Sequence, residues 1–268
     1  MKSPRVIAVI LLKDNIVVQS YKFKIYFPIG ELSQSVKYLH EWGIDEIIIL
    51  KIDKDKKINF KLLEKIIKKY NLPICYGGGV TNLKQIRKLL DIGVDKVSFN
   101  SLLVNEKNKI SNFANYLGNQ FVVGSVDFCL VDDKYYIYNH VNQNIIKNDV
   151  LSTIIEYENL GVGEFHFNFV NLDGVGKGME INLIKKISGK IKTPILVSGG
   201  ASNCKHLIDF YIKTKCTPCL SNFFNHIENP VSTIKSGYYN SFKEVRNDNY
   251  YPYNNYEFDI HLKRNINK

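Results

Sequence analysis

The 268-residue sequence has no long hydrophobic run and few cysteines. No apolar stretch approaches the roughly 18 residues that suggest a membrane-spanning helix. Residues 1–5 lead directly into a strand-like run without a small-residue cleavage site. We therefore expect a cytoplasmic protein with no membrane partner.

The five cysteines are an odd number, which argues against a disulfide framework. Cys216 and Cys219 have the C-x-x-C spacing of zinc and redox sites, but no second pair of ligands stands nearby in the sequence. We predict no metal and no cofactor, and we expect Cys219 to pack inside a strand.

Lysine and arginine give the chain a formal net charge of +10. A nucleic-acid interface would gather these residues on one face and interleave aromatic side chains. The lysines are instead dispersed over nearly every predicted helix. Compositional bias explains this better than nucleic-acid binding, and an anionic phosphorylated ligand is the remaining alternative.

Continuous apolar runs alternate with segments of helical period along the chain. Strictly alternating strand and helix units predict parallel strands joined by right-handed crossovers, with both faces of the sheet covered. The predicted strands are 5–12, 46–51, 73–77, 96–100, 121–127, 164–169, 194–198 and 217–221. Predicted helices include 59–70, 82–92, 106–117, 148–160 and 180–191.

The second half of the chain repeats motifs of the first. Gly43–Glu46 returns as Gly161–Glu164, and Pro73–Gly79 returns as Pro194–Gly200. An open doubly wound sheet has no reason to repeat its units in this way. We therefore predict a (β/α)8 TIM barrel over residues 1–237, built from two duplicated half-barrels, and a Tyr/Asn-rich extension at 238–268 that is packed or partly disordered.

Small and polar residues follow four predicted strands, at the face where TIM barrels carry their sites. Glycines there let backbone N–H groups approach an anion, as at phosphate sites. The alternative is that glycine only permits the turn. The pairs, in chain order, are Gly78-Gly79, Asn100-Ser101, Gly199-Gly200 and Ser221-Asn222.

Asp127 ends the fifth strand and points toward the barrel mouth, where a carboxylate suits general acid/base chemistry. The less favoured alternative is a structural acid satisfied by neighbouring backbone donors. The equivalent run of the first half, Val6–Leu12, ends without a carboxylate. Asp173-Gly174, after the sixth strand, either contacts substrate or forms a turn.

Four charged residues precede strands at the opposite face: Arg5, Glu46, Lys96 and Glu164. Charges that point into a barrel must pair, because an unpaired buried charge costs several kcal/mol. Position alone favours a surface salt-bridge ring of little energetic value.

Four motifs in order carry a resemblance to a known family: Tyr76–Val80, Asp95–Ser101, Gly161–Glu164 and Ser198–Ala201. Over about residues 4–235 the chain resembles the cyclase subunit of imidazole glycerol phosphate synthase. The resemblance implies a duplicated half-barrel that receives ammonia from a glutaminase at its amino-terminal face. It also implies a doubly phosphorylated substrate at the other face.

The resemblance also implies roles for single residues. Arg5, Glu46, Lys96 and Glu164 match the family's ammonia gate, in place of a surface ring. Asp95 matches an aspartate facing the glutaminase, and Asp127 matches the second catalytic aspartate. The implied phosphate contacts are Gly79, Asn100, Ser101, Asp173, Gly174 and Gly200.

The sequence departs from the family at the residues that carry the chemistry. Leu11 stands where the first catalytic aspartate is expected, and leucine transfers no proton. Gln19 replaces a phosphate-loop lysine, and Ser221-Asn222 replaces a pair of small residues.

Two motifs, Leu11–Lys13 and Cys75–Gly79, resemble a paralogous branch of this family. That branch implies ammonia delivery, with a glutaminase partner, to a sugar amidotransferase that makes an acetamidino sugar of lipopolysaccharide or flagellin glycan. We keep two alternatives: a lyase-type imidazole glycerol phosphate cyclase of histidine biosynthesis, and a non-catalytic phosphate-ligand-binding regulator of the glutaminase.

Overall fold

The computed structural model describes residues 3–53, 55, 57–245, 257–258 and 264–265. Within them, eight parallel strands form a closed barrel, because β1 pairs with β4 and β12, and β10 pairs with both β7 and β11. In order around the barrel the strands are β1 (Ile7–Lys13), β4 (Glu46–Lys51), β5 (Ile74–Gly77), β6 (Lys96–Phe99), β7 (Val122–Val131), β10 (Glu164–Phe169), β11 (Ile195–Ser198) and β12 (Thr217–Leu220). The predicted (β/α)8 barrel is confirmed.

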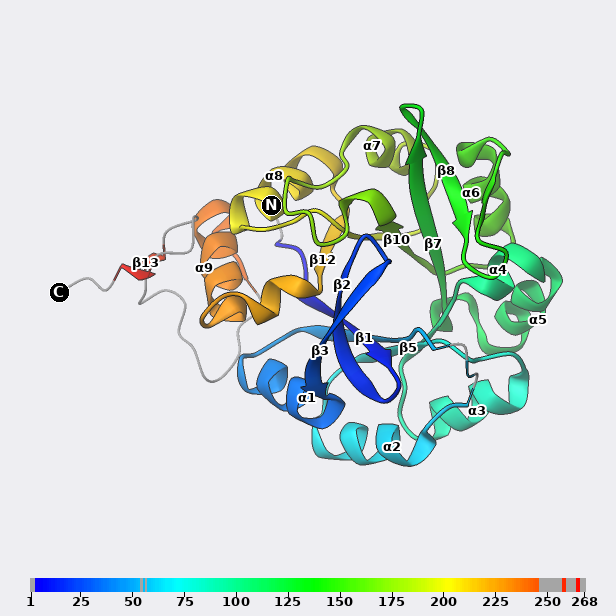
Figure 1. Ribbon diagram of the computed structural model, residues 1–268, viewed down its shortest axis with the longest axis horizontal. Coiled ribbons are helices and arrows are strands. Elements are labelled where there is room, and N and C mark those ends of the chain that lie inside the picture. The colour runs from blue at the N-terminus through cyan, green and yellow to red at the C-terminus, as the bar shows by residue number, and fades with distance from the viewer. Residues whose placement is uncertain (1–2, 54, 56, 246–256, 259–263, 266–268) are drawn as a thin grey trace.

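Helices surround the strands as an outer ring (Figure 1). Apolar side chains at helical spacing turn toward the strands, as Ile86 and Leu89 do in α3. Asparagine caps begin several helices, for example Asn82, whose side chain accepts a hydrogen bond from the Gln85 amide. The helices are α1 (Leu32–Glu41), α2 (Phe60–Lys69), α3 (Leu83–Asp91), α4 (Ser101–Asn105), α5 (Lys107–Leu117), α6 (Val150–Asn159), α7 (Asn182–Ser188), α8 (Cys204–Thr214) and α9 (Pro230–Phe242), with 3-10 turns η1 (Asn119–Phe121), η2 (Val170–Leu172) and η3 (Asn222–Asn225).

Helix α9 crosses the predicted boundary at 237/238 and ends at Phe242. Most of the predicted extension lies outside the described residues. Its described backbone consists of residues 238–245 and two short strands, β13 (Glu257–Phe258) and β14 (Arg264–Asn265), which pair antiparallel. Among the described residues, no helix is long and apolar enough to cross a bilayer.

Two β-hairpins interrupt the alternation of strands and helices, and the sequence analysis did not predict them. After β1, strands β2 (Ile16–Tyr21) and β3 (Ile25–Glu31) form an antiparallel hairpin. Strand β7 runs beyond the barrel and pairs with β8 (Lys134–Asn139), which pairs with β9 (Asn144–Ile146). Both hairpins are prominent in Figure 1.

The barrel interior is a separate apolar cluster inside the ring of strands. Inward side chains of a TIM barrel form layers contributed by alternate strands. The strand registers place Ile48, Ser98, His166 and Cys219 in one layer. Cys219 is only 1% exposed within β12, as predicted.

Candidate functional site

The four charged residues at the amino ends of the strands form a closed ring in which each cation contacts both carboxylates. The Arg5 guanidinium pairs with Glu46 and lies 2.7 Å from Glu164 Oε1. The Lys96 Nζ lies 2.6 Å from Glu164 Oε2 and 3.2 Å from Glu46 Oε1. We call these residues the four-charge ring.

The carboxylates of the ring are buried and its cations are partly exposed. Burial alone would lower the pKa of Lys96, but the charges of Glu46 and Glu164 outweigh it and raise that pKa. The same carboxylates raise the pKa of Arg5, although burial alone would lower it. Both cations therefore stay charged at neutral pH, and each desolvated carboxylate has two cationic partners. The four-charge ring is therefore expected to be stronger than the weak surface salt-bridge ring that sequence position alone favours.

Asp95 lies beside the ring and is exposed. Its Oδ2 accepts a hydrogen bond of 2.7 Å from the amide of Ile74. Asp45 holds the amide of Val6 in the same way, at 2.7 Å, and also pairs with Lys235. The bond to Ile74 fixes Asp95 at the strand ends of the amino-terminal face, and Asp45 is fixed there by its own contacts.

Polar groups continue into the barrel interior beyond the ring. His166 is fully buried, and its Nε2 lies 2.7 Å from Ser198 Oγ. Among the described residues, His166 Nδ1 and Ser98 Oγ have no hydrogen-bond partner, although both are buried. Burial lowers the pKa of His166 to about 4, so this imidazole is neutral at pH 7.

The sequence analysis missed His166 and Ser98. Strand β10 reads Glu-Phe-His-Phe-Asn-Phe, with a polar residue at every second position. Since alternate residues of a strand face the same side, this pattern could have placed Glu164, His166 and Asn168 in the interior together.

Asp127 lies at the carboxyl end of the barrel, which we call the mouth, and is 5% exposed. Its Oδ1 accepts a hydrogen bond of 2.8 Å from Asn168 Nδ2. Its Oδ2 accepts one of 2.9 Å from Asn100 Nδ2 and lies 2.6 Å from His140 Nε2. Asn100, predicted as a phosphate contact, thus holds the carboxylate, and His140 is a neighbour that the sequence analysis missed.

Three other predicted phosphate contacts hold the β2–β3 hairpin at the mouth. Asp173 accepts hydrogen bonds from the Ser20 hydroxyl and, at 3.2 Å, from the Phe23 amide. Asn222 Nδ2 donates to the carbonyl of Ser20 at 2.7 Å. Gly174 leaves no room for a side chain, because a Cβ there would lie 2.8 Å from the Ser20 oxygen.

The glycine turns are tightly packed against neighbouring backbone. A Cβ on Gly78 would lie 2.1 Å from the Lys51 oxygen, and one on Gly200 would lie 1.9 Å from the Gly178 oxygen. Gly79 and Gly199 also have positive φ. The turn geometry therefore requires glycine here, and phosphate binding at these turns, Ser101 and Ser221 stays a prediction.

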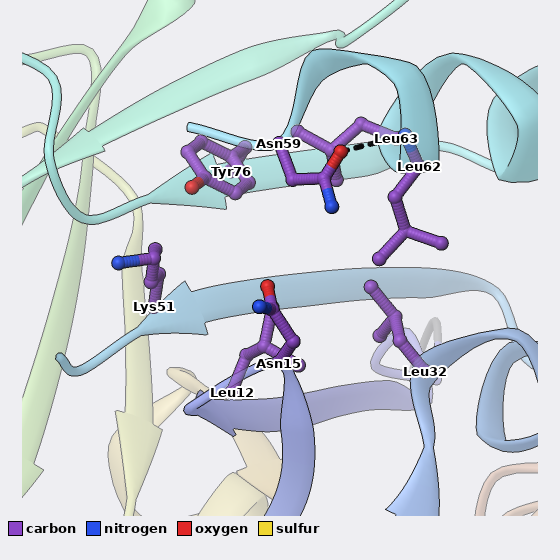
Figure 2. A pocket seen from close by; sticks show the side chains of 8 residues that line it. All are labelled: Leu12, Asn15, Leu32, Lys51, Asn59, Leu62, Leu63 and Tyr76. Carbon is purple, nitrogen blue, oxygen red and sulfur yellow. Dashed lines mark hydrogen bonds between the residues drawn. The ribbon is translucent and has the colours of Figure 1, made fainter. Parts of the chain in front are cut away.

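A pocket lies on the outer side of the barrel strands, next to α2 (Figure 2). Four of its eight lining residues are leucines, and the Lys51 amino group pairs with Asp53 at 3.0 Å. The pocket is separate from Asp127. Its lining residues are Leu12, Asn15, Leu32, Lys51, Asn59, Leu62, Leu63 and Tyr76. Within the part of the chain that the structure describes, no cluster of three or more His, Cys, Asp or Glu side chains could hold a metal.

Residues 5–220 match the family described as histidine biosynthesis protein. The chain is 31% identical over 260 residues to a Vibrio vulnificus protein provisionally named imidazole glycerol phosphate synthase subunit hisF2, with 96% of each chain covered. A Campylobacter jejuni protein with the same provisional name is 34% identical over 204 residues, covering 75% of this chain and 82% of the other. Imidazole glycerol phosphate synthase subunit HisF of Petrotoga mobilis is 32% identical over 216 residues, covering 79% and 86%.

Proposed function

The chain belongs to the histidine biosynthesis protein family and is HisF-like, and from this premise we propose that it is the barrel subunit of a glutamine amidotransferase. It receives ammonia from a HisH-like glutaminase at the amino-terminal face and passes it to the mouth. The observation that carries the proposal is the complete four-charge ring at one end of an interior whose other end holds Asp127.

The interior between these ends suits a small neutral molecule that forms hydrogen bonds. His166 and Ser98 each present an unpartnered polar atom there, among the described residues. Burial disfavours ammonium because it is charged, whereas neutral ammonia can donate to a neutral imidazole. Asp95, exposed beside the ring, is available to the glutaminase.

The proposed acceptor pathway is amidination of a surface-glycan sugar by a separate sugar amidotransferase. Leu11 supports this, because the strand registers place it in the layer of Asp127, across the barrel, where it offers no acid. The second candidate is synthesis of imidazole glycerol phosphate, which the names of the relatives favour. In the third, the chain binds a phosphorylated ligand and regulates the glutaminase without passing ammonia.

Reconstitution with a glutaminase tests the proposal. Product formation is measured with glutamine and, separately, with ammonium chloride, with and without a sugar amidotransferase. We expect omission of this chain to abolish the glutamine-supported product, imidazole glycerol phosphate or amidinated sugar. An unchanged yield without this chain rejects the proposal. If replacing Lys96 leaves ammonia transfer intact while glutaminase stimulation persists, the regulator is supported instead.

A further inference from the structure

We propose that Asp127 and His140 form a pair at the mouth, in which Asp127 orients the imidazole and His140 transfers protons when this barrel adds ammonia to a carbonyl carbon, as in the second candidate function. The inference rests on the proposed delivery of ammonia through the barrel. It goes further, because it names His140, which no family motif indicated, as the residue that transfers protons at the mouth.

The pair is defined by its contacts. His140 follows β8 in the turn before β9, and its Nε2 lies 2.6 Å from Asp127 Oδ2. Asn100 and Asn168 donate to the same carboxylate at 2.9 and 2.8 Å. A carboxylate with three donors acts as an acceptor that orients the imidazole, in the way a carboxylate orients a catalytic histidine.

Two hairpins hold the imidazole in place. Tyr138 of β8 packs edge-on against it, with ring centroids 4.7 Å apart. Phe23, in the β2–β3 turn, lies against it at 5.6 Å. Since Asp173 accepts from the Phe23 amide, the β2–β3 hairpin is itself fixed. The imidazole is thus positioned by both hairpins, yet its side chain remains 37% exposed.

The arrangement leaves one nitrogen of His140 available for chemistry. With Nε2–H donating to Asp127, Nδ1 carries the lone pair, and no described residue bonds to it. Burial alone would lower the pKa of His140, but the hydrogen bond and charge of Asp127 outweigh it and raise the pKa. A histidine pKa above its ordinary value suits both uptake and return of a proton near neutral pH.

The proposed step balances without another reactant. The ammonia lone pair forms a C–N bond to the carbonyl carbon, and the C=O π pair moves to oxygen. Nδ1 of His140 accepts a proton from the nitrogen that has become positive. The imidazolium then returns a proton to the alkoxide, which regenerates neutral His140 and completes the addition.

His140 also accounts for the missing acid of the first half-barrel. Leu11 cannot transfer protons, and the register places it on the far side of the mouth from Asp127. The proton-transfer group comes instead from the turn after β8, within the same half-barrel as Asp127. His140 can therefore both accept and return a proton, which would make the acid missing at Leu11 unnecessary for the second candidate function.

A titration tests the pair without any substrate. The ring nitrogens of His140 are followed by NMR against pH in the full chain, as wild type and as Asp127→Asn. We expect the pKa of His140 to lie above 6.5 in the wild type and to fall in the variant. Tyr138, Tyr26 and Asp173 are titratable groups near Asp127, and they are the same in both proteins. An unaltered pKa in Asp127→Asn rejects the pair.

Activity with ammonium chloride tests the chemistry in the reconstituted complex. We expect His140→Gln to lower kcat about 10²–10⁴-fold, with little change in KM and with loss of the corresponding limb of the pH profile. His40→Gln, on the outer helix α1, serves as the control. A wild-type rate in His140→Gln overturns the inference but leaves ammonia delivery standing. If the wild-type complex forms neither candidate product, delivery and pair are both rejected.

Discussion

The imidazole Nε2 of His166 and the hydroxyl Oγ of Ser198 lie 2.7 Å apart inside the barrel, on adjacent strands. This contact gives Nε2 of His166 a hydrogen-bond partner, although the His166 side chain is fully buried. The other nitrogen is left without a partner among the described residues. Protonation of His166 would bury an unpaired positive charge, which destabilises the folded state.

We predict that His166 makes the protein less stable as the pH falls. Its pKa is about 4 in the folded chain, against an ordinary value of about 6.5 in the unfolded chain. Between these values the unfolded state binds a proton that the folded state does not, so stability falls with falling pH. From pH 6.5 to pH 5 this amounts to about 1.6 kcal/mol.

Urea denaturation at the two pH values measures this effect. In His166→Leu the pH dependence should shrink by that amount, whatever the variant's stability at pH 7. His140→Gln is the matched comparison, because His140 should contribute little pH dependence between these two pH values and acts, with the opposite sign, above pH 6.5. The folded pKa of His140 is raised, so its contribution is present below pH 6.5 and lost as the pH rises through the raised value. The same pH dependence in His166→Leu and wild type would contradict the assignment.

Replacing Lys96 should destabilise the four-charge ring. Lys96→Met removes one of the two cations that face the buried carboxylates of Glu46 and Glu164. Because Lys96 is itself 22% exposed, we expect a loss of about 1–3 kcal/mol, between the values for surface and buried pairs. Thermal or urea unfolding at pH 7 measures it.

Lys68→Met is the control for the ring. Lys68 pairs with Glu64 on the surface of α2, and both side chains are well exposed. Its replacement should change stability by less than about 1 kcal/mol. Equal losses in the two variants would show that the ring is no stronger than a surface pair.

Asp173 should control the position of the β2–β3 hairpin. Asp173→Asn replaces the carboxylate that accepts from the Ser20 hydroxyl and the Phe23 amide. An amide oxygen is a weaker acceptor than a carboxylate, so the Phe23 amide should exchange with solvent faster, about 5–30-fold for a loss of 1–2 kcal/mol. Hydrogen exchange followed by NMR measures it.

The control for Asp173 is Asp149→Asn, at the start of α6, where asparagine caps nearly as well as aspartate. It should leave the Phe23 amide unchanged. Faster exchange of that amide in both variants would indicate general loosening, and slow exchange in both would show that Asp173 is not the anchor.

The sequence was sufficient to predict the barrel. The barrel strands were found because strands buried on both faces are continuous apolar runs. The β2–β3 hairpin was missed because β3 is mostly exposed and shows no clear pattern. The turn that leads from β1 into this hairpin was a usable signal, since Asp14 and Asn15 are both turn formers and both have positive φ.

The partner of Asp127 could not be predicted in the same way. His140 reaches it only because β7 and β8 form a long hairpin that folds back to the mouth. No periodicity links residues 127 and 140. The roles of Asp173 and Asn222 were also not predictable, because both contact Ser20, on a hairpin that the sequence analysis lacked.

Gly200, in the turn after β11, and Gly178 share a positive φ but differ in how closely other backbone atoms approach them. Gly200 and Gly178 both have positive φ, 87° and 108°. A Cβ on Gly200 would lie 1.9 Å from the Gly178 oxygen, whereas a Cβ on Gly178 would meet nothing within 4 Å. Gly178→Ala should therefore cost only the conformational strain of about 1–2 kcal/mol. Gly200→Ala should cost about 1–3 kcal/mol more, because the turn must shift. Urea unfolding of both variants measures the difference, and equal costs would show that the turn yields without resistance.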